Sequence, residues 1–258
     1  MKTYVLIGAG NLATNLGCAL QQIGYVCKQV YSRTESSAME LSHLLKCPYT
    51  TNLKSLEIAD LYIFSVKDSV LETLIKGMGP VNRDALFVHT AGSMSIDVFK
   101  SHVSHYGVLY PLQTFSKHRI LNFENIPCFI EGNTIYAESI LLDLAKTLSH
   151  RIYKMTSDKR RYLHLAAVFA CNFVNHCYAC AERILDEVQI PFDALLPLID
   201  ETSQKVHEMS PKRAQTGPAV RYDENVLNSQ KELLDGNETM KNFYDIISKN
   251  IYSLSQEK

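Results

Sequence analysis

The sequence lacks features that would assign it to several special classes of protein. No apolar run reaches the roughly 18 to 20 residues of a membrane span, and no signal-peptide pattern opens the chain. Neither sign of charge dominates, because 26 lysines and arginines face 27 acidic residues, so no net field exists to hold nucleic acid or an anionic membrane. We therefore expect a cytoplasmic protein that binds small molecules or other proteins.

The seven cysteines lack the spacing of a metal site or a disulfide framework. Their number is odd, and most of them lie within apolar stretches, as reduced core thiols do. Cys177 and Cys180 form one C-x-x-C inside a helical pattern, without the second pair that a zinc site needs. We predict no metal, and a metal or redox role of this pair is the alternative.

What is present is the pattern of a two-domain α/β protein. Up to about residue 155, short apolar runs alternate with amphipathic stretches, which is typical of βαβ units and predicts a doubly wound parallel sheet covered on both faces. The predicted strands span 3–7, 25–32, 61–65, 86–89, 108–110, 128–131 and 151–154. Helical patterns lie between several of them, at 11–23, 36–45 and 135–148.

After Thr156 the strand signals stop, and the remaining chain has the pattern of helices alone. These helices are predicted over 158–188, 192–209, a segment after 223, and 237–255. We therefore divide the chain into an α/β domain of residues 1–156 and an all-α domain of residues 157–258. The helices of the second domain look too elongated to bury their apolar faces alone, which predicts a homodimer formed through it.

The first strand runs directly into a glycine-rich turn of the form G-x-G-x-x-A, followed by a helix. The first glycine permits a tight turn, and the second leaves the backbone open to a pyrophosphate that the helix N-terminus attracts. This setting predicts a dinucleotide site, with a purely structural turn as the alternative. The residues of the turn are Gly8, Ala9, Gly10, Asn11, Leu12 and Ala13.

The end of the second strand indicates which dinucleotide binds. A cofactor without a 2′-phosphate usually meets an Asp or Glu about 20 residues after the glycine turn. Ser32, Arg33 and Thr34 stand there instead, and a guanidinium with two hydroxyls suits a phosphate dianion. We therefore predict NADP(H) rather than NAD(H), the alternative being that Arg33 is a solvated loop residue.

Two more polar groups follow predicted strands at their carboxyl ends, where ligands of open parallel sheets bind. We expect the cofactor's ribose and nicotinamide near residues 65–67 and 89–91. We expect the substrate near residues 92–93. A polar loop without a ligand is the alternative for both. The groups are Ser65, Val66 and Lys67, and then His89, Thr90, Ala91, Gly92 and Ser93.

Nearly the whole chain resembles a group of NADP oxidoreductases that have a Rossmann-like domain and a helical C-terminal domain of unknown function. The group is related to pyrroline-5-carboxylate reductases and 6-phosphogluconate dehydrogenase-like proteins. The resemblance implies a Rossmann fold followed by an all-α domain like the C-terminal domain of 6-phosphogluconate dehydrogenase. It is carried by the glycine turn with 32–34, and by 65–68, 89–93, 111–115, 164–167, Asn172, 196–199, 215–218, Arg221 and Asp223.

The chain departs from these relatives where a substrate would be met. Lys67, Tyr110 and Tyr222 stand where the group often has Pro, His and Gly. The lysine that 6-phosphogluconate-type dehydrogenases carry one turn before an asparagine is also missing, because Val168 and Cys171 stand at the corresponding positions. These differences speak against oxidation of an alcohol through a lysine, and they favour reduction of a C=N bond or an acid from elsewhere.

The long predicted helix supplies that acid. His164 is our candidate proton donor, because an imidazole exchanges protons near neutral pH. At 100° per residue it shares a polar face with Asn175, while Asn172 lies near the edge of that face. We predict His164, Asn172 and Asn175 as catalytic residues lining a cleft between the domains, with a satisfied polar network in a dimer as the alternative.

One further segment suggests how a substrate is held. Gly217-Pro218-Ala219 resembles the Gly-Pro-Ala segment of pyrroline-5-carboxylate reductases, and by that comparison Thr216 and Arg221 hold a substrate carboxylate, unless the segment is only a helix cap. We therefore expect an NADP(H)-dependent oxidoreductase of a small anionic carbonyl or imine. Because no acid or base is certain, a non-catalytic dinucleotide-binding sensor or assembly protein is the alternative.

Overall fold

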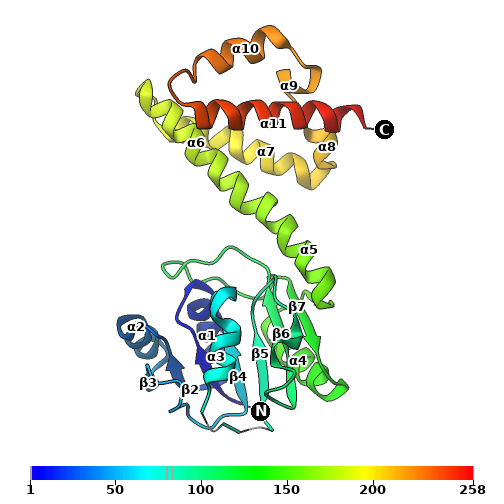
Figure 1. Ribbon diagram of the computed structural model, residues 1–258. Coiled ribbons are helices and arrows are strands. Elements are labelled where there is room, and N and C mark those ends of the chain that lie inside the picture. The colour runs from blue at the N-terminus through cyan, green and yellow to red at the C-terminus, as the bar shows by residue number, and fades with distance from the viewer. Residues whose placement is uncertain (1, 80, 83, 258) are drawn as a thin grey trace. The chain divides into compact units, whose positions relative to one another are not determined.

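The computed structural model describes residues 2–79, 81–82 and 84–257. The chain divides into two compact units, Met1–Cys171 and Asn172–Lys258. The first unit is an α/β sheet with helices on both faces, and the second is made of helices (Figure 1). The sequence placed the boundary between residues 156 and 157, whereas the compact units divide farther along, inside the long helix that follows the sheet.

The sheet has eight strands in the order β3-β2-β1-β4-β5-β6-β7-β8. All neighbours pair in parallel except β6 and β7, which pair antiparallel. The sheet is therefore dominated by parallel pairs rather than wholly parallel, because the chain between β6 and β7 forms no helical crossover to carry it back. The strands are β1 Thr3–Ile7, β2 Val26–Tyr31, β3 Tyr49–Thr50, β4 Leu61–Phe64, β5 Leu86–His89, β6 His105–Pro111, β7 Cys128–Gly132 and β8 Ile152–Lys154.

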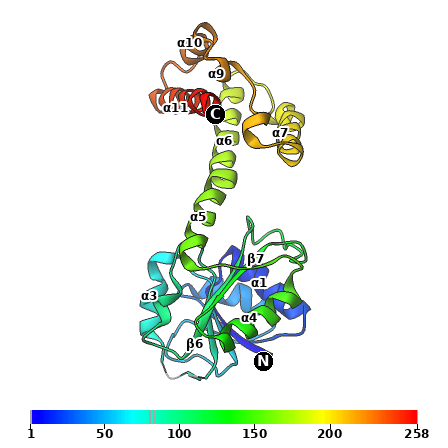
Figure 2. The same ribbon diagram turned by 90° about the vertical axis from the view of Figure 1, so that its right-hand side faces the viewer.

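Alternating side chains of the strands build two apolar layers, one on each face of the sheet. Tyr4 and Leu6 of β1 pack with α1 (Asn11–Gln22), α2 (Glu35–Leu45) and α4 (Ile135–Leu148). Val5 and Ile7 face the other way, toward α3 (Asp68–Gly77) and the 3-10 turn Ile96–Phe99. Figure 2 shows α3 and α4 on opposite sides of the strands. The sequence analysis did not predict α3 or the two-residue strand β3.

The long helix after the sheet is not a regular α-helix throughout. It consists of α5 (Ser157–Ala167), a π-helical segment Val168–Phe173, and α6 (Val174–Glu187). The wider i→i+5 turns of a π segment change the rotation from residue to residue, so the even 100° spacing behind the predicted polar face does not hold across it. The helix Ser157–Glu187 is long and apolar enough to cross a membrane, by length and composition only. Core helices of soluble proteins meet the same two criteria.

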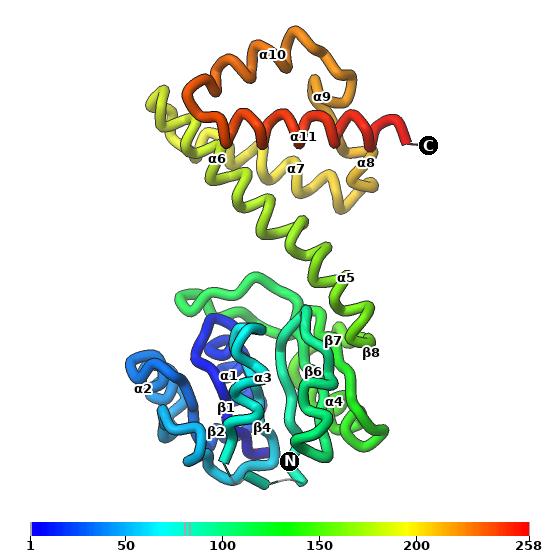
Figure 3. The backbone as a smooth tube through the Cα atoms, viewed as in Figure 1, coloured from blue at the N-terminus to red at the C-terminus, as the bar shows by residue number. Residues whose placement is uncertain are grey.

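The helical unit continues from α6 through shorter elements to a long terminal helix (Figure 3). Side chains cap two of these helices: Asp223 accepts a hydrogen bond from the Val226 amide, and Asn237 from the Met240 amide. The Ser255 hydroxyl joins α11 to α9 through the Val220 carbonyl. The elements are a 3-10 turn Phe192–Leu195, α7 Leu196–Glu208, α8 Pro211–Ala214, α9 Pro218–Arg221, α10 Glu224–Glu232 and α11 Glu238–Gln256.

Candidate active site

A cavity of about 860 Å³ lies at the carboxyl ends of the parallel strands, within the first unit. Its walls come from the segments that follow β1, β2, β4 and β5, from the end of β6, and from α5. Most residues predicted from the sequence for the cofactor and the reaction meet there. They are Gly8, Ala9, Gly10, Asn11, Leu12, Ser32, Arg33, Thr34, Ser65, Val66, Lys67, Thr90, Ala91, Gly92 and His164.

The glycine turn has the shape that a pyrophosphate requires. Gly8 has a φ of +117°, and a Cβ atom there would overlap the Ser65 carbonyl, so only glycine fits. A Cβ on Gly10 would meet nothing within 4 Å, which leaves open space over the backbone. Helix α1 begins at the next residue without a side-chain cap, so its first N–H groups are free to bind an anion. These features fit the diphosphate of a dinucleotide.

The end of β2 offers a cationic rim to the same cavity. Arg33 is exposed there, between Ser32 and Thr34, and the Ser32 hydroxyl accepts a hydrogen bond from the Thr34 amide at 3.3 Å. Glu35, the next carboxylate along the chain, accepts a hydrogen bond from the Tyr49 hydroxyl. This leaves Arg33 as the charged group that the β2 end presents to a ligand in the cavity.

His89 differs from the other predicted cofactor residues, because its ring is fully buried and does not line the cavity. Its Nδ1 accepts a hydrogen bond from the Ala91 amide at 3.2 Å, and the ring stacks on Phe99. Burial, aided by the charge of Arg160, lowers the pKa of His89 to about 3. The neutral imidazole therefore supports the turn after β5 through the Ala91 amide, and it is not among the residues that line the cavity.

Arg160 of α5 anchors the same turn from the other side, a role that the sequence analysis missed. Its guanidinium is fully buried, pairs with Glu131 of β7 at 2.7 Å, and donates to the carbonyls of Ala91 and Met94 at 3.3 and 2.5 Å. The Ser157 hydroxyl completes the cluster by donating to Glu131 at 2.7 Å. A Ser-x-x-Arg spacing at a helix start is too common to have revealed this cluster.

Ser93, predicted to meet the substrate, lies beside the cavity rather than among its lining residues. Its hydroxyl donates to the carboxylate of Asp68, which does line the cavity at the start of α3. This hydrogen bond joins the segment after β4 to the segment after β5. Asp68 is thus a further polar group of the cavity that the sequence analysis quoted only as part of a resemblance.

Tyr110 and His164 form a hydrogen-bonded pair in the cavity wall. The Tyr110 hydroxyl lies 2.9 Å from His164 Nδ1, with the rings edge to face. A Cβ atom on Gly92 would come within 2.6 Å of His164 Cγ and Nδ1, so the imidazole packs directly on that glycine. Burial raises the pKa of Tyr110 to about 12, partly opposed by the charge of Arg160. The sequence analysis noted Tyr110 only as a departure from related proteins.

The remaining predicted site residues belong to the helical unit and are exposed there. Asn172 lies in the π segment and Asn175 in α6, whereas Thr216 precedes α9 and Arg221 ends it. Their part in catalysis or substrate binding stays a prediction.

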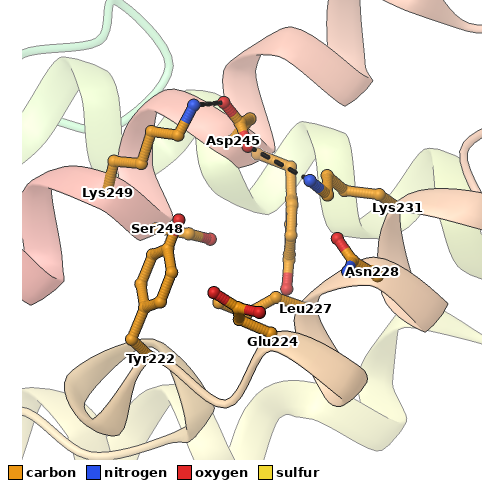
Figure 4. A pocket seen from close by; sticks show the side chains of 9 residues that line it. Tyr222, Glu224, Leu227, Asn228, Lys231, Asp245, Ser248 and Lys249 are labelled. Atoms are coloured by element: carbon orange, nitrogen blue, oxygen red, sulfur yellow. Dashed lines mark hydrogen bonds and ion pairs between the residues drawn. The ribbon is translucent and has the colours of Figure 1, made fainter.

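The helical unit has a smaller cavity of its own, of about 230 Å³ (Figure 4). Asp245 of α11 pairs there with Lys249 at 2.5 Å and with Lys231 at 3.3 Å, and these ammonium groups lower the pKa of its carboxyl. Glu224 adds a second acidic group to the wall, so the charges balance. Across the residues that the structure describes, no group of three or more His, Cys, Asp or Glu is placed to hold a metal ion.

Comparisons with known proteins give the chain a family. A model described as a Rossmann-like domain matches residues 3–113, and one described as a domain of unknown function (DUF2520) matches residues 126–251. A comparison with curated proteins found no match. Among solved structures, a Bacteroides fragilis protein with the provisional name NADP oxidoreductase is 49% identical, with a TM-score of 0.92 over 98% of each chain.

Two more distant structures share the fold. An imine reductase variant from Myxococcus stipitatus, solved with NAD+, is 15% identical over 98% of this chain and 93% of its own, with a TM-score of 0.66. A 1-pyrroline-5-carboxylate reductase from Streptococcus pyogenes is 14% identical over 97% and 98%, with a TM-score of 0.60. The chain belongs to the family of the Bacteroides fragilis protein, in which a Rossmann-like domain precedes the domain of unknown function.

Proposed function

We propose that this protein is an NADP(H)-dependent oxidoreductase that reduces a small anionic carbonyl or imine compound. The oxidoreductase assignment is supported by the family to which the chain belongs and by the names of its structural neighbours. The observation that carries the proposal is the content of one cavity: a glycine cradle for a diphosphate, an exposed arginine, and a hydrogen-bonded Tyr110–His164 pair.

Different residues of the cavity would hold different parts of the cofactor. Gly8 to Leu12 and the first N–H groups of α1 hold the diphosphate, and Arg33 with Ser32 and Thr34 holds the 2′-phosphate. The turns after β4 and β5, from Ser65 to Lys67 and from Thr90 to Ala91, would contact the nicotinamide ribose. When bound, the cofactor supplies a hydride from its nicotinamide ring.

The second half of the reaction is a proton transfer from the protein. An oxygen that gains the electron pair of a C=O bond needs a proton, whereas an iminium already carries the charge that the hydride neutralises. We assign this proton to the His164 side of the cavity, with Asn172 and Asn175 assisting. Gly92 and Ser93 would hold the anionic group of the substrate, and Thr216 and Arg221 of the helical unit stay our candidates for the same role.

The cofactor assignment is tested by substituting Arg33. Arg33→Ala removes the charge that would face the 2′-phosphate, so NADPH affinity is expected to fall about 10- to 100-fold, while NADH affinity stays the same. Isothermal titration calorimetry of both variants with both nucleotides measures this. Arg151→Ala, at a position outside the cavity, is the matched control. Equal losses for NADPH and NADH, or none for NADPH, would contradict the choice of NADP(H).

We also propose that the protein is a cytoplasmic homodimer formed through its helical unit. Large apolar side chains are exposed on that unit, among them Leu198 of α7 and Ile246 and Leu254 of α11. Such faces are normally covered in solution, and a second copy is the simplest cover. Light scattering is expected to give a dimer, and hydrogen exchange in α7 and α11 to quicken on dilution while the sheet stays protected. A monomer at micromolar concentration would refute the assembly.

A further inference from the structure

The two residues of the Tyr110–His164 pair differ in burial: Tyr110 is the inner, buried residue and His164 the outer, half-buried one. The Tyr110 side chain is 7% exposed and packs against Phe129, which in turn stacks on Tyr153. His164 is half-buried and lies on α5, with its ring against Gly92. The hydroxyl of the inner residue bonds Nδ1 of the outer one at 2.9 Å. Of the two side chains, the imidazole is therefore the better placed to exchange protons with solvent.

Burial keeps the Tyr110 phenol protonated. Two charged groups influence it electrostatically: Arg160 of α5, whose charge lowers its pKa, and Asp68 of α3, whose charge raises it. Burial outweighs the effect of Arg160 and acts in the same direction as Asp68, so Tyr110 holds its proton throughout the neutral range. His164 lies on α5, where it contacts Tyr110 of β6 and Gly92 in the turn after β5. The pair therefore consists of a protonated phenol that is hydrogen-bonded to an imidazole.

We propose that Tyr110, rather than His164, donates the proton to the reduced substrate, and that His164 reloads Tyr110. This inference rests on the proposed function. As the substrate carbon accepts a hydride, the electron pair of its C=O or C=N bond moves to the oxygen or nitrogen. That atom takes the proton from Tyr110 Oη, and protonated His164 then gives its Nδ1 proton to the phenolate. Water returns a proton to the imidazole, so the pair ends as it began.

The arrangement assigns different roles to the two residues. Tyr110 is a catalytic residue, since its hydroxyl would touch the reacting atom, and His164 is a positioning residue that acts through Tyr110. Gly92 belongs to the same device, because any side chain there would push the imidazole away from the phenol. The sequence suggested the other order, in which His164 acts directly on the substrate.

The first test reads the hydrogen bond itself, without turnover. In full-length protein carrying ¹⁵N-labelled histidine, the His164 Nδ1 resonance reports on the hydrogen bond that Nδ1 makes, and His164→Asn identifies the signal. Tyr110→Phe is expected to move it toward the position of a free imidazole. Tyr153→Phe, which removes a phenol from the same aromatic cluster, leaves it in place. An unchanged resonance in Tyr110→Phe would overturn the pairing.

The second test compares two substrates that differ in their need for a proton. NADPH oxidation is followed with a 2-oxo acid, which needs one, and with an N-methylated cyclic iminium ion, which does not. Tyr110→Phe is expected to lower kcat for the 2-oxo acid about 10²- to 10⁴-fold and to change the iminium rate less than about threefold. Equal losses for both substrates, or no loss for either, would overturn the role of Tyr110.

The same assays separate this inference from the proposed function. A wild-type protein that binds no NADPH in a fluorescence titration refutes the proposed function. Wild-type protein that binds NADPH but turns over neither probe supports the non-catalytic sensor and overturns both proposals. Turnover of both probes by wild-type protein, with Tyr110→Phe indistinguishable from it, leaves the oxidoreductase standing and overturns only the inference about Tyr110.

Discussion

The sheet unit and the helical unit differ in where their apolar side chains lie. The sheet unit buries long runs of them in layers on both faces of its strands. In the helical unit, the buried residues among those described are Ala219, Leu227 and Ser248, and many large apolar side chains are exposed. The first unit therefore stabilises its own cavity, whereas the second leaves apolar faces for another surface to cover.

The architecture of the two units also explains why the predicted site residues of the sheet unit line one cavity, whereas those of the helical unit lie on exposed surfaces. In a parallel sheet, the segments after successive strands gather at one edge because the strands all end there. Residues far apart in sequence, such as Arg33, Lys67 and Gly92, therefore line one cavity. The helical unit has no comparable rule, and its predicted residues Asn172 and Thr216 lie on exposed surfaces.

The largest expected difference between the two units is the loss of stability on substitution in the glycine turn. Gly8→Ala forces a Cβ into the Ser65 carbonyl at a φ of +117°, and we expect it to cost about 3 kcal/mol or more of the free energy of unfolding. The sheet unit would unfold first. Chemical denaturation followed by circular dichroism and tyrosine fluorescence measures the loss.

Gly10→Ala is the matched control for that substitution. Its Cβ meets no atom within 4 Å and the backbone is extended, so stability is expected to stay within about 1 kcal/mol of wild type. The added methyl group would stand where a diphosphate is expected, and NADPH affinity should fall about tenfold or more. Equal stability losses for the two substitutions would show that the turn is not the constrained element we describe.

A second experiment compares one ion pair from each unit. Arg160→Met leaves Glu131 without its charged partner in a largely buried place, with the Ser157 hydroxyl as its remaining donor, and we expect a cost of about 3 to 5 kcal/mol. Asp245→Asn breaks the pairs with Lys231 and Lys249 in the helical unit, which are more exposed than the Arg160 pair, and is expected to cost far less. Adding Glu131→Gln to Arg160→Met should restore part of the loss. Similar losses in the two units would contradict the contrast in burial.

A third and smaller effect is expected in the pH dependence of stability. The pKa of His89 is about 3 in the folded protein and about 6.5 when exposed, so the unfolded chain binds more protons between these values. Stability is therefore lost as pH falls through that window, by about 2 kcal/mol between pH 6.5 and 5. His89→Asn keeps an acceptor for the Ala91 amide but removes this titration, and should flatten the profile.

His176→Asn provides the control from the helical unit. His176 is exposed on α6, and its ring contacts Phe243. The substitution is expected to leave the pH profile of unfolding unchanged, because it lies outside the sheet unit and leaves the buried His89 in place. Urea denaturation at several pH values would reveal the difference. Parallel profiles for His89→Asn and wild type would contradict the burial of a neutral His89.

Local patterns were sufficient for the main elements and for the cradle. Alternating apolar residues and turn signals located β1, β5 and α4 at the bounds that the structure has. The glycine turn and Arg33 were readable because their chemistry resides in a few adjacent residues. These features depend on neighbours within one strand, one turn or one helix, which is the range over which sequence patterns act.

Contacts between distant segments were decided by the tertiary structure alone. The antiparallel β6–β7 pair, the burial of His89 beneath its turn, the Arg160 cluster and the Tyr110–His164 hydrogen bond all join residues whose spacing carries no periodic signal. The π segment likewise changed which residues share a helix face. Such contacts arise when the sheet and α5 pack together, because packing brings side chains within hydrogen-bonding distance whatever their separation along the chain.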